Sequence, residues 1–237
     1  MYTLFFVAPE DISQDLIKLA GPQAHHAISV LRVQKSEMIR LADGSGNWIE
    51  GEVLEVAKDF LTIKVKTRGS DRAPKVHITL AQALLKGENQ KAALDHLVQA
   101  GVETIIPWQA DRSVASIDKS EKWREVVIAA ARQSRRARIP HLAPMTDLQA
   151  LMGMRATFDT VIALHESAVH ALSSIKELAT AKKLLVIVGP EGGLSNQELD
   201  ELMKSEIPLV KLGDPVIRAD LAGAIALGGI QVLIGEW

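Results

Sequence analysis

Hydrophobic and polar positions follow two different patterns along the chain. Up to residue 70, short runs alternate between apolar and polar residues with the period of half-buried strands. The predicted strands are Tyr2–Val7, Glu37–Leu41, Trp48–Val56 and Leu61–Lys66. One short helix is predicted at Gln23–Arg32. This pattern resembles a small β-barrel over residues 1–70. The polar segment Thr67–Pro74 marks the predicted domain boundary.

From residue 75 to residue 237, strands alternate with helices, which predicts a parallel sheet covered on both faces. The predicted strands are Val76–Leu80, Thr104–Pro107, Thr160–Leu164, Lys183–Val188 and Leu209–Leu212. The predicted helices are Gln90–Ala100, Lys119–Arg138 and Arg218–Leu233. Ser195, with Glu198 three residues later, is typical of a capping box at the start of a further helix.

Composition restricts the class of protein. The net charge is −2, so binding of nucleic acid would require local basic patches. The absence of cysteine excludes disulfides and thiolate chemistry. Since no apolar run reaches the ~18 residues that cross a bilayer, and the first residues lack the pattern of a signal peptide, we expect a cytoplasmic protein outside membranes. No histidine spacing indicates a metal site.

The segment Val188–Ser195 (VGPEGGLS) carries the sharpest local signal. It lies between a buried-type strand and the capped helix, and ligands of open α/β sheets bind outside the carboxyl ends of strands. Its glycines allow a ligand to approach the backbone closely. It is neither a P-loop nor a dinucleotide fingerprint, and a simple tight turn remains the alternative interpretation.

Three further groups of residues are candidates for function. Arg218 and Asp220 begin an otherwise apolar helix, where the helix dipole disfavours an arginine; ordinary surface charges are the alternative. Arg132, Arg135 and Arg136 would share one helical face suited to phosphates, or would form a solvated helix end. A weaker basic patch is formed by His25, His26, Arg32 and Lys35.

Taken together, the two loop motifs are more specific than either alone. GPEGG at 189–193, followed by LGDPVIRAD at 212–220, resembles the C-terminal signature of the SPOUT methyltransferases, in particular the bacterial 16S ribosomal RNA (uracil-N3)-methyltransferase family. The resemblance extends over nearly the whole chain. It includes His25–Arg32, the DGSG segment at 43–46, Ile106–Ser113 and the arginine-rich segment that ends at Pro140.

The resemblance implies a trefoil-knotted α/β domain over residues 75–237 behind a smaller PUA-like β-barrel over residues 1–70. It implies a homodimer that methylates N3 of a uridine, number 1498 of 16S rRNA, in the small ribosomal subunit. The cofactor would be S-adenosylmethionine, without a metal. The residues that would hold it are Leu164, His165, Glu166, Gly189, Pro190, Glu191, Gly192, Leu212, Gly213, Ile217, Leu221 and Ala222.

For the chemistry, we predict that Arg218 stabilises the uracil anion, and that Asp220 or Glu191 positions this arginine or accepts the proton. RNA contacts are expected from the basic residues His25, Arg32, Lys35, Arg112, Arg132, Arg135 and Arg136. Asp220 and Leu221 stand where the family usually has Glu and Thr. Three alternatives stay open: a knotted methyltransferase with another RNA target, a non-catalytic RNA-binding or assembly factor, and an unrelated nucleotide-binding enzyme.

Overall fold

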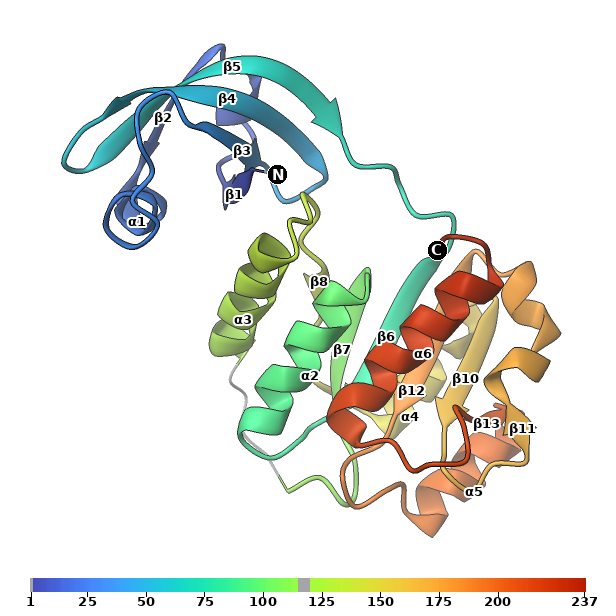
Figure 1. Cartoon of the computed structure of the whole chain (residues 1–237). Coiled ribbons are helices and arrows are strands. Elements are labelled where there is room, and N and C mark those ends of the chain that lie inside the picture. The colour runs from blue at the N-terminus through green and yellow to red at the C-terminus, as the bar shows by residue number, and fades with distance from the viewer. Residues whose placement is uncertain (1, 115–119) are drawn as a thin grey trace. The chain divides into compact units, whose positions relative to one another are not determined.

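The computed structural model describes residues 2–114 and 120–237. The chain divides into two compact units (Figure 1). The N-terminal unit comprises the chain up to Ala73 together with Ala131–Ile139. The C-terminal unit comprises Pro74–Ala130 and Pro140–Trp237. The sequence predicted two consecutive ranges, 1–70 and 75–237. In the structure, Ala131–Ile139 belongs to the first unit although it lies within the second range.

The N-terminal unit is built on a curved five-stranded sheet with the order β1-β3-β4-β5-β2 (Figure 1). Its strands are β1 (Thr3–Phe6), β2 (Leu16–Ala20), β3 (Met38–Ala42), β4 (Asn47–Val56) and β5 (Phe60–Ser70). Strands β1 and β3 are parallel, and the other pairs are antiparallel. The concave face buries an apolar core that includes Phe5, Ile17, Ile39, Leu41 and Ile63. The four predicted strands are present, and β2 was missed.

The predicted helix at Gln23–Arg32 is shorter than expected. It consists of α1 (Gly21–His25), which continues as one π-helical turn, η2 (His26–Val30). Pro22 stands in the first turn, where its missing N–H costs nothing. The chain leaves the helix through Arg32, which adopts a left-handed conformation with φ 55°.

The arginine-rich segment docks on the turn between β3 and β4. Gly46 donates its N–H to the carbonyl of Ala137 (3.2 Å), and Ile139 donates to the carbonyl of Gly44 (2.9 Å). The side chain of Ala137 is fully buried. Gly46 has φ 110°, a conformation that favours glycine, and a Cβ there would also displace the Arg138 guanidinium, which lies 2.6 Å from the Cβ position.

This docking corrects the predicted helix at Lys119–Arg138. Helix α3 (Ser120–Gln133) ends one residue after Arg132, before Arg135 and Arg136, and Lys119 lies outside the described residues. Arg135 adopts φ 59°, so Arg135 and Arg136 do not share a helical face with Arg132. Helical periodicity continues in the sequence, but the hydrogen bonds to the β3–β4 turn determine the conformation of the backbone.

The C-terminal unit contains a parallel sheet in the order β11-β13-β10-β12-β6-β7-β8, with β9 also pairing with β7. Its strands are β6 (His77–Ala83), β7 (Thr104–Gln109), β8 (His141–Leu142), β9 (Thr146–Asp147), β10 (Thr160–Leu164), β11 (His170–Ala171), β12 (Lys183–Val188) and β13 (Leu209–Lys211). Its helices besides α3 are α2 (Glu88–Gln99), α4 (Leu148–Gly153), α5 (Asn196–Lys204) and α6 (Ala219–Leu233).

Helices α2 and α6 pack against each other on one face of this sheet (Figure 1). The strands are almost continuously apolar because helices cover both faces. Trp108 is fully buried among them and donates its indole N–H to the carbonyl of Val188 (3.1 Å). This bond fixes the end of β12, where the glycine-rich segment begins. The predicted parallel α/β arrangement is therefore confirmed.

Candidate active site

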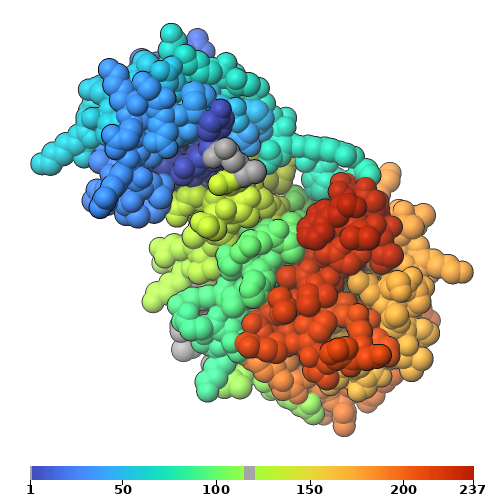
Figure 2. All heavy atoms as spheres, viewed as in Figure 1, coloured from blue at the N-terminus to red at the C-terminus, as the bar shows by residue number. Residues whose placement is uncertain are grey.

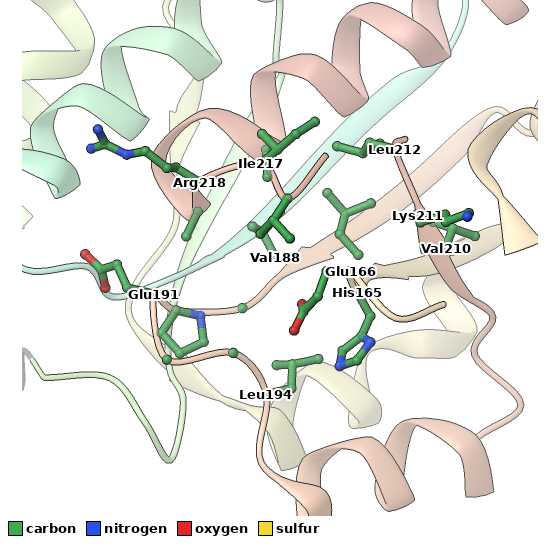
Figure 3. A pocket seen from close by; sticks show the side chains of 18 of the residues that line it. His165, Glu166, Val188, Glu191, Leu194, Val210, Lys211, Leu212, Ile217 and Arg218 are labelled. Atoms are coloured by element: carbon green, nitrogen blue, oxygen red, sulfur yellow. The ribbon is translucent and has the colours of Figure 1, made fainter. Parts of the chain in front are cut away.

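A cavity of about 590 Å³ opens at the carboxyl ends of β10, β12 and β13 (Figure 3). Because neighbouring parallel strands end at the same edge, the segments that follow them meet there. The first is His165–Glu166, the second is Gly189–Leu194 and the third is Leu212–Arg218. The two loop motifs of the sequence are therefore walls of one cavity.

The structure brings together the predicted cofactor residues, with one exception. All of them line the cavity except Leu221, which is 39% exposed on α6. The cavity is also lined by residues that sequence reasoning missed, namely Val188, Gly193, Leu194, Asn196, Leu199, Val210, Lys211, Asp214, Pro215, Val216 and Ala219. Most of these are direct neighbours of the predicted residues, so the strand-end rule could have found them.

Charged residues line the cavity at both ends. In Figure 3, Arg218 and Glu191 lie at one end, and Lys211 and Leu212 lie away from them at the other. Leu194 is buried, and a Cβ at Gly189 would approach its Cδ2 to 3.1 Å, so glycine lets the loop pack this closely without displacing Leu194.

Arg218 is the N-cap of α6, and its guanidinium is paired with Asp220. Nε donates to Oδ1 of Asp220 (3.0 Å), and Nη2 donates to Oδ2 (3.2 Å). The Asp220 side chain is 11% exposed, whereas that of Arg218 is 72% exposed. A half-buried carboxylate therefore holds a guanidinium that remains open to a ligand.

Glu191 lies beside this pair and is held as an anion. Its Oε1 accepts hydrogen bonds from Nδ2 of Asn89 (3.0 Å) and from the backbone N–H of Lys86 (3.1 Å). Burial raises the pKa of Glu191, but these hydrogen bonds and the charge of Arg218 outweigh burial and hold the pKa below its ordinary value. A carboxylate with a lowered pKa is a weaker proton acceptor, which disfavours Glu191 as a general base.

The glycine-rich segment is also fixed from the other side, by the loop after β7. Asp111 accepts a hydrogen bond from the Ser195 hydroxyl (2.5 Å) and donates its N–H to Glu198 (2.9 Å). Glu198 also accepts from the Ser195 N–H (2.7 Å), so the predicted capping box is confirmed. Arg112, next in sequence, donates to the carbonyl of Gly192 (3.0 Å). Sequence reasoning missed this clamp because its partners are about eighty residues apart.

Comparison with known proteins identifies the family. Residues 72–231 match the model of an RNA methyltransferase domain, and residues 19–66 match an RNA methyltransferase PUA domain. The chain belongs to this RNA methyltransferase family. It is 35% identical to ribosomal RNA small subunit methyltransferase E of Mycobacterium bovis, covering 99% of this chain and 93% of that protein. It is 28% identical to the Bacillus subtilis enzyme of the same name, covering 90% and 88%.

Solved structures of this family agree with the fold. The Neisseria gonorrhoeae ribosomal RNA small subunit methyltransferase E, bound to S-adenosyl methionine, superposes with a TM-score of 0.86 at 24% identity, covering 98% of each chain. A methyltransferase from Legionella pneumophila, in complex with the same cofactor, gives a TM-score of 0.87 at 24% identity, also covering 98% of each chain. The predicted family, the SPOUT fold with a PUA-like domain, and the class of enzyme are confirmed.

An RNA methyltransferase needs basic side chains that contact RNA. The predicted RNA-binding residues fall into two sets. Arg112 belongs to the C-terminal unit and lines the cavity. The others belong to the N-terminal unit: His25, Arg32, Lys35, Arg132, Arg135 and Arg136. Within that unit, Arg132 donates to the side chain of Gln23 (3.4 Å) on α1, the helix that also carries His25. Arg112 and the arginine cluster therefore belong to different units.

No helix in residues 2–114 or 120–237 is long and apolar enough to span a membrane. The same residues contain no group of three or more His, Asp or Glu side chains arranged to hold a metal ion.

Proposed function

We propose that the protein methylates N3 of one uridine in the RNA of the small ribosomal subunit, with S-adenosylmethionine as the methyl donor. One observation carries this proposal: a glycine-walled cavity with a carboxylate-held arginine at its mouth, in a chain similar over its full length to ribosomal RNA small subunit methyltransferase E. The same residues that the family signature singled out surround that cavity.

The residues present fit the cofactor. A volume of about 590 Å³ lies within the range of ~300–1,000 Å³ that small-molecule sites occupy. Leu164, Leu194 and Ile217 offer apolar surface for an adenine ring, and the backbone of the second and third loops offers hydrogen-bonding groups for its edge. When bound, S-adenosylmethionine supplies an electrophilic methyl group, which requires no metal.

Arg218 performs the central task in this reaction. N3 of uracil carries a proton, and it becomes a nucleophile only when that proton leaves. A guanidinium that donates to a uracil carbonyl stabilises the negative charge that develops there, and thereby favours loss of the proton. The Arg218 side chain is 72% exposed, so solvent water can reach the mouth of the cavity and take up the proton. Asp220 orients the arginine, since both of its oxygens are already bonded to it.

Recognition of the RNA is assigned to the basic groups. His25, Lys35 and Arg135 are exposed on the N-terminal unit, and Arg112 lies beside the cavity. Contacts to phosphates release counterions, so affinity for RNA should fall steeply as salt is raised. Binding that does not change between low and high salt would contradict this assignment.

A second copy of the chain is the proposed partner of helix α6. Leu221, Ile225 and Val232, here called the α6 stripe, are exposed at the spacing of one helical face. Between Asp220 and Glu236 the chain has no charged residue. Figure 2 shows this helix, coloured orange-red to red, at the surface of its unit. An uncharged apolar stripe that begins beside the cavity supports a homodimer paired around the site.

The oligomeric state tests this part of the proposal. Ile225→Glu puts a charge in the middle of the α6 stripe and should give a monomer in light scattering, while the wild type is a dimer. Met203→Glu is the matched control, because Met203 is also an exposed apolar residue but lies on α5. A dimeric Ile225→Glu variant, or a monomeric wild type, would exclude the stripe as the interface.

We also propose that the protein acts in the cytoplasm on the small subunit. Small subunits from cells that lack the protein provide the test: incubation with the purified protein and S-adenosylmethionine, followed by mass spectrometry of nucleosides, should yield 3-methyluridine at one position. Arg218→Ala should bind the cofactor in calorimetry but form little product. A ribose-methylated nucleoside would favour another RNA target. Absence of both heat and product would favour a non-catalytic RNA-binding protein.

A further inference from the structure

Asn89 connects the two charged groups at the mouth of the cavity. It lies in the first turn of α2 and is half-buried. Its Nδ2 donates to Oε1 of Glu191 (3.0 Å), and its Oδ1 accepts from Nη2 of Arg218 (3.2 Å). These partners are more than one hundred residues away in the sequence. The family signature does not include Asn89.

Only one orientation of the amide satisfies both neighbours. The reverse orientation would set the amide oxygen against the Glu191 carboxylate and the NH₂ group against the Arg218 guanidinium, each a pair of like groups. An aspartate in place of Asn89 would repel Glu191, and a lysine would repel Arg218. A neutral side chain that both donates and accepts is therefore required at this position.

The position of Asn89 is itself fixed by the start of α2. The N–H of Lys86 donates to the same oxygen of Glu191, and the buried side chain of Gln90 accepts from the N–H of Leu85 (2.9 Å). These bonds anchor the turn that precedes and includes Asn89.

The hydrogen bonds of Arg218 decide which of its atoms remain for a substrate. A guanidinium has five N–H groups: one on Nε and two on each terminal nitrogen. Asp220 takes the one on Nε and one on Nη2, and Asn89 takes the other on Nη2. Across residues 2–114 and 120–237, no acceptor is bonded to Nη1. Nη1 is therefore the edge left to donate.

We propose that Asn89 is a positioning residue: by bridging Glu191 and Arg218 it occupies the second hydrogen of Nη2, fixes the rotation of the guanidinium and leaves Nη1 to bind the uracil carbonyl. This inference rests on the proposed role of Arg218 in uridine methylation. It assigns Glu191 to the same bridge, as the carboxylate that orients the Asn89 amide.

Two variants separate the two bonds. Asn89→Ala removes both, and Asn89→Asp keeps an acceptor for Arg218 while it loses the donor to Glu191. Gln99→Ala is the matched control, because it truncates an amide at the other end of α2 whose side chain donates to Asp95 on the same helix. All three should bind S-adenosylmethionine with an affinity within about twofold of wild type, since Asn89 does not line the cavity.

The expected results differ between the variants. For Asn89→Ala, kcat should fall roughly tenfold or more with little change in KM, as for one lost hydrogen bond to a charged group. For Asn89→Asp, the new carboxylate should raise the pKa of Glu191 and move the acidic limb of the pH–rate profile upward. The charged groups in the segments that meet at Glu191 are Arg218, Asp220, Arg112, Lys86 and Glu88. Gln99→Ala should match wild type throughout.

A readout independent of methylation keeps this inference distinct from the proposed function. The carboxyl carbon of Glu191, followed by NMR against pH, should titrate at a higher pH in both Asn89 variants than in wild type. If wild type forms no 3-methyluridine but this titration moves, the proposed function fails while the bridge stands. If wild type is active and Asn89→Ala retains its kcat and its Glu191 titration, the inference is overturned.

Discussion

Replacing Asp220 with alanine tests whether the carboxylate orients Arg218 or merely accompanies it. The side chain of Asp220 is 11% exposed and accepts two hydrogen bonds, from Nε at 3.0 Å and from Nη2 at 3.2 Å. Without it, the guanidinium of Arg218 keeps only the bond to Asn89 and can rotate about several side-chain torsions. The positive charge stays at the mouth of the cavity, but its direction is lost.

The magnitude follows from the geometry. A hydrogen bond to a charged group contributes about 1.5–3 kcal/mol, but water replaces part of this where the arginine is mostly exposed. With Arg218 72% exposed, we expect a loss of about 1–2 kcal/mol in transition-state stabilisation, which is roughly a five- to thirtyfold decrease in kcat. The affinity for S-adenosylmethionine should change by less than about twofold, because both carboxylate oxygens of Asp220 are already bonded to Arg218.

The assay is methylation of small subunits under single-turnover conditions, with cofactor affinity measured by calorimetry. Asp15→Ala is the control, because Asp15 also pairs with an arginine, Arg68 at 2.7 Å, but lies in the N-terminal unit and is fully exposed. If Asp220→Ala turned over as fast as Asp15→Ala, the orientation argument would be refuted. A large loss of cofactor affinity with unchanged kcat would instead make Asp220 a cofactor ligand.

Three further predictions concern stability. Gly46→Ala should lower the free energy of unfolding by about 1–2 kcal/mol in urea denaturation, because φ is 110° and the new Cβ meets Arg138. Glu198→Ala should cost about 2–3 kcal/mol by the same measurement, since it removes the cap shared with Ser195 and buries unpaired N–H groups. Burial raises the pKa of Glu191, but hydrogen bonding outweighs burial and holds the pKa below its ordinary value of 4.5. The Glu191 carboxylate therefore stabilises the fold above pH 4.5, and this contribution is lost as the pH falls through the lowered pKa. The stability difference between wild type and Glu191→Gln should therefore shrink as pH falls below 4.5.

Periodicity predicted most strands because their environment is uniform along their length. After their first residues, Thr160 and Lys183, β10 and β12 are apolar and buried, as expected of strands covered on both faces, and both match the predicted ranges residue for residue. β2 was missed although Leu16–Ala20 alternates between exposed and buried positions, so the period-two signal was present in the sequence.

The end of α3 was mispredicted for a different physical reason. The helical pattern of the sequence continues to Arg138, but Gly44, Gly46 and the buried Ala137 form a better local arrangement. The hydrogen-bonded partners are about ninety residues apart. No local signal in residues 131–139 indicates that this segment docks on the turn between β3 and β4. A tertiary contact decided the conformation where helix propensity was only a weak preference.

The position of the cavity could be predicted from the carboxyl ends of the predicted strands. Three loops after neighbouring parallel strands had to meet, and the glycines identified which of them approach a ligand. Asn89 and Asp111 could not be found in this way, because each acts through a side-chain bond to a residue on a distant element. Their sequence neighbourhoods, the first turn of a helix and a loop after a strand, have the same appearance in proteins without a site.

The first turn of α6 connects the chemistry of the cavity with the surface of the helix. Arg218 has an extended backbone (φ −60°, ψ 145°), and this conformation lets its side chain return to Asp220 two residues later, so the short arm of aspartate suffices where the family usually has glutamate. The next residue points about 100° further around the helix. Leu221 therefore leaves the cavity and joins the α6 stripe with Ile225. Two successive residues thus serve different surfaces: Asp220 holds the arginine at the cavity, and Leu221 adds apolar area to the α6 stripe.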